Sequence, residues 1–276
     1  MIKFEHTVFA LPFAFLAALG AARGIPSVRT ILWILVAMVG ARTAAMTFNR
    51  LADLDLDGEN PRTANRALPS GRVSLWAAYG MLGLAILVFC FAAAMLGPLP
   101  YRLAPLALGV ILGYSFCKRF TSWSHGILGL SLAAAPLGAW IAVAGRVEVP
   151  AWALATGVLA WSAGFDIIYA LQDEAFDRRH GLHALPARVG ARRALRVSRG
   201  LHALATLAWG AYNVLAGAHL PAWLAWAAVV AILVQEHRLV GEGRLERVDA
   251  AFFAMNSWVG PIFFVGHLME WFVFHT

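Results

Sequence analysis

The sequence has few charged residues and almost no cysteine. Only 13% of its 276 residues are Asp, Glu, Lys or Arg, while 61% are hydrophobic, and the mean hydropathy is +0.69. This composition excludes an ordinary soluble globular domain and indicates an integral membrane protein. The two cysteines, Cys90 and Cys117, lie in separate apolar segments without metal-site spacing. We therefore expect both to be buried free thiols.

Several catalytic signatures are also missing from the sequence. There is no P-loop, no HExxH, no nucleophile elbow and no dinucleotide-binding glycine motif, so a covalent-nucleophile mechanism has little support. The formal net charge is +7, but the basic residues are scattered through short loops between apolar runs, which argues against nucleic acid as a partner. No cleavable leader pattern precedes the body, so we expect the first apolar run to remain in the mature protein.

Nine apolar runs approach the length that a helix needs to cross a bilayer. Because backbone groups in lipid must be satisfied internally and no strand-like alternation is present, these runs predict helices. The sequence therefore predicts a single all-α membrane domain, residues 1–276, with nine transmembrane helices. The runs are Val8–Ala22, Val28–Phe48, Leu75–Leu96, Leu103–Phe116, His125–Ala144, Trp152–Leu171, Ala194–Ala216, Pro221–Gln235 and Ala250–Phe274.

The connecting loops alternate in basic charge, and this alternation predicts an orientation. One set of loops carries most of the basic residues, and the other set holds only Arg23, Arg29, Arg102 and Arg146. Under the positive-inside rule the richer set is cytoplasmic. The richer set is Lys3; Arg50, Arg62, Arg66, Arg72; Lys118, Arg119; Arg178, Arg179, Arg188, Arg192, Arg193, Arg196, Arg199; and Arg238, Arg244, Arg247.

An acidic stripe ends the second apolar run. Asn49, Asp53 and Asp57 are spaced i, i+4, i+8, which places one amide and two carboxylates on one face of a helix. Such a stripe favours a bound hard cation, and oxygen ligands suit Mg²⁺. Arg62, Arg66 and Arg72 follow at once in the sequence. Carboxylates beside arginines predict a site for a phosphorylated, metal-bridged substrate.

A second acidic motif follows the sixth run. Asp173 and Asp177 repeat the i, i+4 spacing, and Asp166 lies two turns earlier on roughly the same face. Both motifs fall on the predicted cytoplasmic side, so the two carboxylate pairs are able to face each other across one cavity. An isolated Asp at a helix end is usually just solvated, but two such motifs on the same side favour a metal–phosphate site.

Other residues add to this site with less specific signals. Lys118 and Arg119 serve either as ordinary membrane-side anchors or as phosphate ligands at the same mouth, with Tyr114 one turn earlier. Arg42 lies inside the second run, where it either pairs with an acid or binds a substrate carboxylate. Tyr169 either lines the cavity or packs, and Asp55 and Glu59 are expected to be solvated. For the single histidines His125 and His202 we expect ordinary packing or surface roles.

These motifs resemble those of the UbiA superfamily of intramembrane aromatic prenyltransferases. The first motif continues as PRTANRALPSG from Pro61 to Gly71, the second follows the run FDIIYALQ, and YSFCKR contains the YxxxKR element. One departure is Arg50, which stands where the family often has an additional Asp. The overall sequence is most similar to 4-hydroxybenzoate polyprenyltransferases, and its N-terminal part to a subgroup linked to the futalosine route to menaquinone.

The resemblance implies a helical bundle around a central cavity open to lipid, in the inner membrane of a bacterium, with its mouth toward the cytoplasm. It implies Mg²⁺-dependent transfer of a polyprenyl group from polyprenyl diphosphate to a phenolic aromatic acid, in ubiquinone or menaquinone synthesis. It also implies roles for individual residues. The metal ligands are Asn49, Asp53, Asp57, Asp173 and Asp177, and the four aspartates are also the catalytic residues. The diphosphate is bound by Arg62, Arg66, Lys118 and Arg119, and the candidates for contact with the aromatic substrate are Arg42, Tyr114, Asp166 and Tyr169.

Three alternatives remain open at the level of the sequence. The acceptor is either 4-hydroxybenzoate or a dihydroxynaphthoate, because both are phenolic acids that need one cationic partner. The same chemistry also serves enzymes that prenylate a haem or chlorophyll precursor. A secondary transporter with ion-coupling carboxylates is the candidate from another class, although its acids would lie near the membrane midplane.

Overall fold

The computed structural model describes residues 9–240 and 248–274, and these residues form helices and no strand. Val8, where the first predicted run begins, and the loop residues Lys3, Arg244 and Arg247 lie outside the described residues. The elements are α1 (Leu11–Ala22), α2 (Val28–Ala52), α3 (Leu54–Glu59), α4 (Leu75–Leu96), α5 (Pro98–Cys117), α6 (Ser124–Ala144), α7 (Val149–Ala170), η2 (Leu171–Asp173), α8 (Glu174–Arg179), α9 (Leu185–Val189), α10 (Ala191–Ala216), α11 (Leu220–Val240) and α12 (Val248–Phe274).

Local sequence signals explain where several of the long helices begin and end. The Ser27 hydroxyl accepts a hydrogen bond from the Thr30 backbone N–H at 3.2 Å, and Ser74 caps α4 through Ala77 in the same way. Gly145 ends α6 with φ of 69°, a left-handed conformation that glycine adopts without steric cost. These caps set the lengths of α2, α4 and α6, and so the depth at which their side chains lie.

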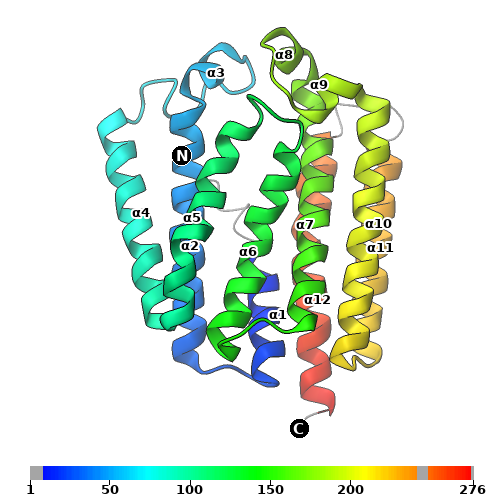
Figure 1. Cartoon of the computed structure of the whole chain (residues 1–276). Coiled ribbons are helices and arrows are strands. Elements are labelled where there is room, and N and C mark those ends of the chain that lie inside the picture. The colour runs from blue at the N-terminus through cyan, green and yellow to red at the C-terminus, as the bar shows by residue number, and fades with distance from the viewer. Residues whose placement is uncertain (1–8, 241–247, 275–276) are drawn as a thin grey trace.

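The long helices run roughly along one axis, and the short ones gather at one end (Figure 1). In this bundle α2 packs against α4, α6 and α10 each pack against α7, and α11 packs against α12. The short helices α3, α8 and α9 form a cap at the upper end in Figure 1. Both acidic motifs belong to this cap or to the helix ends that lead into it.

The described residues contain a helix at each of the nine positions where the sequence predicts a span. Seven candidate spans are long and apolar enough to cross a membrane: α2, α4, α5, α6, the continuous run that begins with α7, α11 and α12. The other two helices differ, because α1 has only 12 residues and the start of α10 is rich in arginine. Seven of the nine predicted spans therefore have the length and composition of a membrane crossing.

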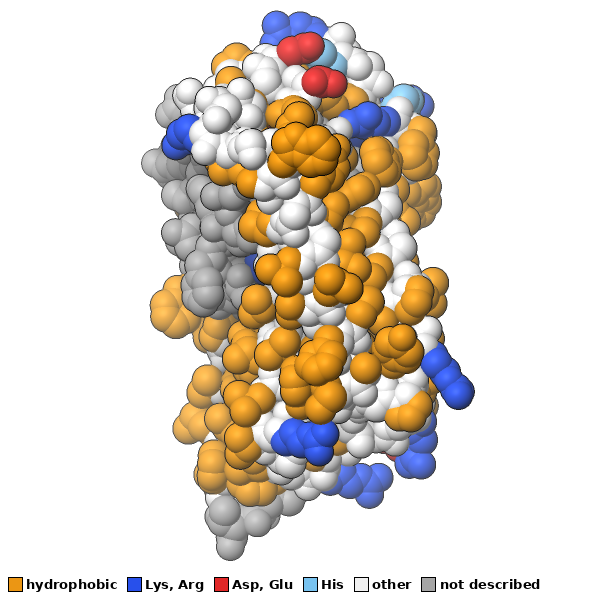
Figure 2. All heavy atoms as spheres, turned by 90° about the vertical axis from the view of Figure 1, so that its left-hand side faces the viewer, with side chains coloured by type: hydrophobic (Ala, Val, Ile, Leu, Met, Phe, Trp, Pro, Cys, Tyr) orange, Lys and Arg blue, Asp and Glu red, His pale blue; other side chains and the backbone are white. Residues whose placement is uncertain are grey.

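The outer surface supports membrane insertion. Figure 2 shows a face on which hydrophobic side chains cover most of the length, with charged side chains mainly toward its two ends. Large apolar residues on α4 point outward, among them Trp76, which is 86% exposed, and Leu87, which is 68% exposed. Such a surface suits lipid, and the chain is an integral, multi-pass membrane protein.

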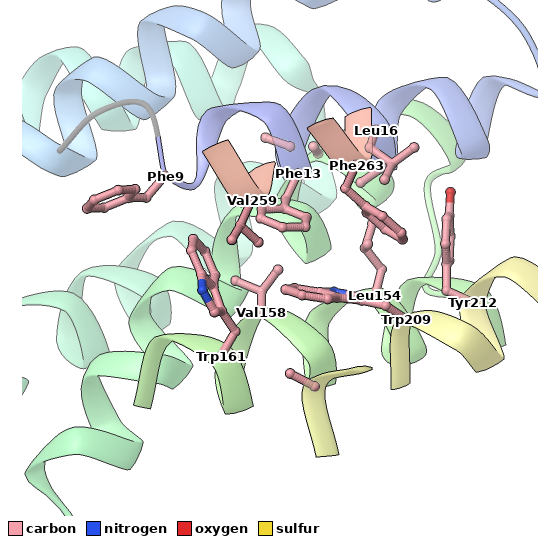
Figure 3. Close-up of a cluster of buried hydrophobic side chains, with 14 of the residues drawn as sticks. Phe9, Phe13, Leu16, Leu154, Val158, Trp161, Trp209, Tyr212, Val259 and Phe263 are labelled. Atoms are coloured by element: carbon pink, nitrogen blue, oxygen red, sulfur yellow. The ribbon is translucent and has the colours of Figure 1, made fainter. Parts of the chain in front are cut away.

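Aromatic side chains from α1, α7, α10 and α12 form the core of the bundle (Figure 3). The Phe13 ring stacks on Trp209 at 5.1 Å between centroids, and Phe13 also contacts Trp161 and Phe263. Trp209 fits only because its neighbour on α7 is Gly157, where a Cβ atom would lie 2.2 Å from the indole nitrogen. This rigid core fixes α7, the helix that carries Asp166.

The predicted boundaries differ from the structure mainly at prolines and polar helix ends. The fourth predicted run corresponds to α5, which begins at Pro98 rather than Leu103 and continues through Pro105. The eighth corresponds to α11, which runs to Val240 rather than Gln235. Proline is tolerated in the first turn of a helix, where its missing N–H is not needed. Hydropathy alone therefore placed these two ends too far inside the helices.

Candidate active site

The first acidic motif spans the junction between α2 and α3. α2 ends at Ala52 and α3 begins at Leu54, so the helix on whose face the three side chains were placed is interrupted at Asp53. The spacing nevertheless survives, because the Asp53 N–H donates to the Asn49 carbonyl at 3.0 Å and the Asp57 N–H donates to the Asp53 carbonyl at 2.7 Å. Asp53 and Asp57 are 3% and 6% exposed, so both carboxylates are buried under the cap.

The second acidic motif lies at the start of the cap on the other side of the cavity. After α7 the chain tightens into the short 3₁₀ helix η2, which ends at Asp173, and α8 then carries Asp177. Asn60, which follows α3, donates its side-chain N–H to Asp173 at 3.1 Å. The two motifs therefore meet at the same end of the bundle, and Asn60 links the second motif to the segment that follows the first.

Each of three motif carboxylates has a basic partner. Lys118 Nζ donates to Asp53 at 2.6 Å, and Arg66 donates to both oxygens of Asp57 at 2.6 and 2.8 Å. Weaker contacts come from Arg119 to Asp53 and from Arg50 to Asp57, at 3.6 and 3.4 Å. The four basic residues predicted to bind the diphosphate therefore lie beside acidic residues predicted to bind the metal. They are Arg62, Arg66, Lys118 and Arg119.

Arg62 forms the most extensive of these pairs. Its guanidinium donates to both oxygens of Asp173 and to the Tyr169 hydroxyl, the last at 2.8 Å. Burial by itself would lower the pKa of Arg62, but the hydrogen bonds with Asp173 and the interaction with Tyr169 outweigh it and raise that pKa. Arg62 therefore stays charged and fixes the second motif against the loop that follows the first.

A cavity of about 970 Å³ lies beneath the cap. Nearly all of the site residues proposed from the sequence line it, and they enter from α2, α3 and its following loop, α5, α7, η2 and α8. Arg119 alone among them does not line the cavity; it reaches Asp53 from beside it. Asp55 and Glu59, which were expected to be solvated, are exposed and do not line this cavity. Separate stretches of the sequence thus converge on one polar chamber.

The donor atoms of this chamber fit Mg²⁺ in one particular way. Among the described residues, no three acidic, histidine or cysteine side chains lie close enough together to enclose an ion by themselves. Mg²⁺ is commonly held by one or two carboxylates together with substrate phosphates, and it demands few protein ligands. Asp53 Oδ1 is buried without a hydrogen-bond partner, as expected for a ligand atom that is not engaged. The site suits a metal shared with a phosphorylated substrate.

A second, apolar chamber of about 230 Å³ adjoins the polar one. Its walls come mainly from α2, α4, α5 and α6 and consist largely of Ala, Leu, Ile and Met. Arg42 and Tyr114 line both chambers, so they stand where the two meet. The Nε and one terminal nitrogen of Arg42 are buried and have no hydrogen-bond partner, so this cation is held ready for an anion.

Sequence reasoning missed several polar residues of the chamber. His125 is buried, lines the cavity and bonds to Asp166 at 2.6 Å, a contact that the sequence did not indicate. His202 does not line the cavity; it packs within the bundle as expected, 3% exposed and bonded to His237 at 3.0 Å. Asn60 and Ser115 join the hydrogen bonds of Asp173 and Asn49. The only signal for these residues was polarity at the end of an apolar run.

A membrane bundle with this combination of chambers suits a substrate with an anionic head and an apolar body. The carboxylates and bases gather at one end of the cavity, and apolar walls lie beyond them. The chain belongs to the UbiA prenyltransferase family, whose model matches residues 10–258. It is a prenyltransferase, which confirms the enzyme class and the family predicted from the sequence.

Similar proteins of known structure and curated relatives agree with this assignment. The apo structure of a UbiA homologue from Aeropyrum pernix K1 superimposes with a TM-score of 0.90 at 32% identity, covering 98% of this chain and 99% of that one. A UbiA homologue from Archaeoglobus fulgidus, solved bound to GPP and Mg²⁺, has a TM-score of 0.75 at 18% identity, covering 96% and 97%. The 4-hydroxybenzoate octaprenyltransferase of Photobacterium profundum is 30% identical over 250 residues, which are 89% of this chain and 85% of that protein.

Proposed function

We propose that this protein catalyses Mg²⁺-dependent transfer of a polyprenyl group from polyprenyl diphosphate to the ring of a phenolic aromatic acid. The observation that carries the proposal is the polar chamber, where two acidic motifs and their basic partners meet beside an apolar chamber. An anionic diphosphate suits the polar chamber and a hydrocarbon suits the apolar walls. The unpartnered Arg42 at their junction suits the carboxylate of the acceptor.

The diphosphate is bound by the bases that now pair with the acids. Arg62, Arg66, Lys118 and Arg119 supply N–H donors to phosphate oxygens, while the released carboxylates of Asp53, Asp57, Asp173 and Asp177, with Asn49, become ligands for metal ions. Bound Mg²⁺ neutralises charge on the leaving diphosphate. Fixed positive charges around the leaving group lower the barrier because they stabilise the transition state more than the ground state.

The acceptor occupies the inner part of the polar chamber. Arg42 binds its carboxylate, and Tyr114, Asp166 and Tyr169 line the space in which the ring lies. As the prenyl C1–O bond breaks and C1 gains positive charge, the electron-rich ring attacks it. The apolar walls contributed by residues such as Leu128 and Leu132 exclude water, which would otherwise capture the carbocation.

The curated relatives support a benzoate-type acceptor. Proteins of Photobacterium profundum and Chromohalobacter salexigens that are 30% and 31% identical to this chain are named 4-hydroxybenzoate octaprenyltransferases. A 1,4-dihydroxy-6-naphthoate is the other acceptor proposed from the sequence, and both serve quinone biosynthesis. We further propose that the enzyme lies in the bacterial inner membrane with the cap formed by α3, α8 and α9 facing the cytoplasm, as the basic loops indicate.

The test uses purified protein in lipid nanodiscs with Mg²⁺, labelled polyprenyl diphosphate and a panel of acids that contains 4-hydroxybenzoate and the dihydroxynaphthoate. Lipid-soluble products are identified by mass spectrometry. We expect Asp53→Asn and Asp173→Asn to lose transfer, while Asp55→Asn, a change of the same kind at an exposed position of α3, stays active. Transfer that survives both site variants, or no product with any acid, would contradict the proposal.

A further inference from the structure

A histidine and an aspartate form a short hydrogen bond on the wall of the polar chamber. His125 lies in the first turn of α6 and is 5% exposed, and its Nδ1 lies 2.6 Å from Oδ2 of Asp166 on α7. Its other ring nitrogen, Nε2, lies 3.2 Å from the backbone nitrogen of Leu185, the first residue of α9. The imidazole therefore links α6, which carries it, to α7 through Nδ1 and to α9 through Nε2.

These contacts determine which ring nitrogen carries the hydrogen. The backbone N–H of Leu185 is only a donor, so Nε2 of His125 must be the acceptor. Nδ1 then carries the ring hydrogen and donates it to the Asp166 carboxylate. The main chain of the cap thus fixes the imidazole in one tautomer, and the imidazole in turn fixes one oxygen of Asp166.

The second oxygen of Asp166 is left for another partner. Within the described part of the chain, no hydrogen bond or ion pair other than that with His125 engages this carboxylate. Asp166 and His125 both line the chamber that contains Arg42 and Tyr114. A carboxylate held from one side and open to a substrate chamber from the other is arranged to accept a hydrogen bond from a ligand.

We propose that Asp166 accepts a hydrogen bond from the phenolic hydroxyl of the acceptor and that His125 is the positioning residue that holds it there. This inference rests on the proposed function and deepens it, because it assigns the second recognition point of the acceptor. Arg42 holds the carboxylate end and Asp166 holds the hydroxyl end. The site thereby selects acids that carry a ring hydroxyl.

The same contact serves the chemistry of transfer. As the prenyl C1–O bond breaks, its electron pair leaves with the diphosphate, and a ring π pair forms the new C–C bond. The phenolic proton passes to Asp166, so the ring becomes a neutral dienone rather than a cation. Asp166 returns that proton to the ring oxygen when the hydrogen on the alkylated carbon leaves as a proton to the released diphosphate, and the ring becomes aromatic again.

The segment that holds His125 also holds the diphosphate side of the chamber. The His183 backbone N–H donates to the carbonyl of Lys118 at 2.7 Å, two residues before Leu185 bonds His125. This short stretch of main chain therefore fixes both the turn with Lys118 and the imidazole that orients Asp166. Its geometry sets the distance between the donor and acceptor parts of the site.

The test compares His125→Leu with His125→Asn in nanodiscs. Leucine has a similar volume but no hydrogen-bond donor. The asparagine amide nitrogen lies near the position of Nδ1 and restores the hydrogen bond to Asp166. The first readout is binding of 4-hydroxybenzoate and of benzoate, without any donor substrate. The second is the KM of each substrate in the transfer assay. Thermal unfolding is recorded for every variant.

We expect the wild type to bind 4-hydroxybenzoate about 10-fold or more tightly than benzoate, as for a hydrogen bond to a charged group. His125→Leu loses this preference and raises the KM of the acceptor but not that of the diphosphate, and His125→Asn regains most of it. Asp166→Leu abolishes the preference, and adding His125→Leu to it has no further effect. The inference would be overturned if His125→Leu still preferred 4-hydroxybenzoate over benzoate as strongly as the wild type. It would also be overturned if the KM of the acceptor and the KM of the diphosphate rose equally. The binding measurement needs no polyprenyl diphosphate, so the preference for 4-hydroxybenzoate can be tested whether or not transfer is detected.

Discussion

Replacing Arg42 with leucine separates the stability of the protein from its recognition of substrate. In the structure, Nε and one terminal nitrogen of Arg42 are buried at the junction of the two chambers without a hydrogen-bond partner. No ion pair with a described acid compensates this charge. Removing the guanidinium therefore removes two unsatisfied donors and breaks no existing bond.

The two effects have opposite signs. A buried donor without a partner costs about 1–3 kcal/mol, so Arg42→Leu is expected to leave the free energy of unfolding unchanged or raise it by up to this amount. A hydrogen bond between charged groups contributes about 1.5–3 kcal/mol, so loss of the bond to the acceptor carboxylate raises the acceptor KM roughly 10- to 150-fold. Arg42→Lys keeps the charge but lacks the planar pair of N–H donors, so its acceptor KM should lie between those of the wild type and Arg42→Leu.

The assay measures transfer kinetics and thermal unfolding in the same nanodisc preparation. The KM of polyprenyl diphosphate should stay constant, because Arg42 makes no hydrogen bond or ion pair with the described acids and bases of the cap. A neutral acceptor such as 4-hydroxybenzyl alcohol serves as the control, since it should react equally with wild type and Arg42→Leu. If Arg42→Leu still prefers the acid over the alcohol as strongly as wild type, the assignment of Arg42 to the carboxylate is wrong.

Three further changes test other parts of the structure. Gly157→Ala places a Cβ 2.2 Å from the indole nitrogen of Trp209, so it should destabilise the core by about 1–3 kcal/mol, seen as a lower Tm with unchanged KM values. Removing divalent ions with EDTA should stop transfer, and Mg²⁺ should restore it; full activity in EDTA would exclude the proposed metal role. Lys118→Met removes the 2.6 Å partner of the buried Asp53, so the KM of the diphosphate should rise about 10-fold in steady-state assays, while that of the acceptor stays constant.

Spacing and hydropathy predicted most of what positions the site. The i, i+4, i+8 pattern of Asn49, Asp53 and Asp57 holds in space although the helix ends at Ala52, because the backbone hydrogen bonds keep the same spacing through Asp53. Apolar runs predicted a helix at each of nine positions, since a helix is the only way to satisfy this backbone in lipid. These features depend on local sequence and on the solvent, both of which can be read without a structure.

Partners that are distant in the sequence were not predictable in this way. Nothing near His125 indicates that it meets Asp166, 41 residues away, or that Leu185 fixes its tautomer. The pairing of Arg62 with Asp173 likewise depends on how the loop after α3 meets η2, and counting charges along the chain does not predict it. Such contacts arise from helix packing, which a single sequence specifies only through the whole fold.

The ion pairs of the cap explain why acids and bases can crowd into one buried chamber before any substrate arrives. Unpaired carboxylates would repel one another and lose hydration, but here each of three has a cation within 2.9 Å. These basic side chains are also the groups proposed to hold the diphosphate. A metal ion that bound the carboxylates alone would leave the basic side chains unpaired, and a diphosphate that bound the basic side chains alone would leave the carboxylates unpaired. Only a metal and a diphosphate together supply new partners for both sets. Each ligand must therefore strengthen binding of the other by the same factor, since such coupling is reciprocal.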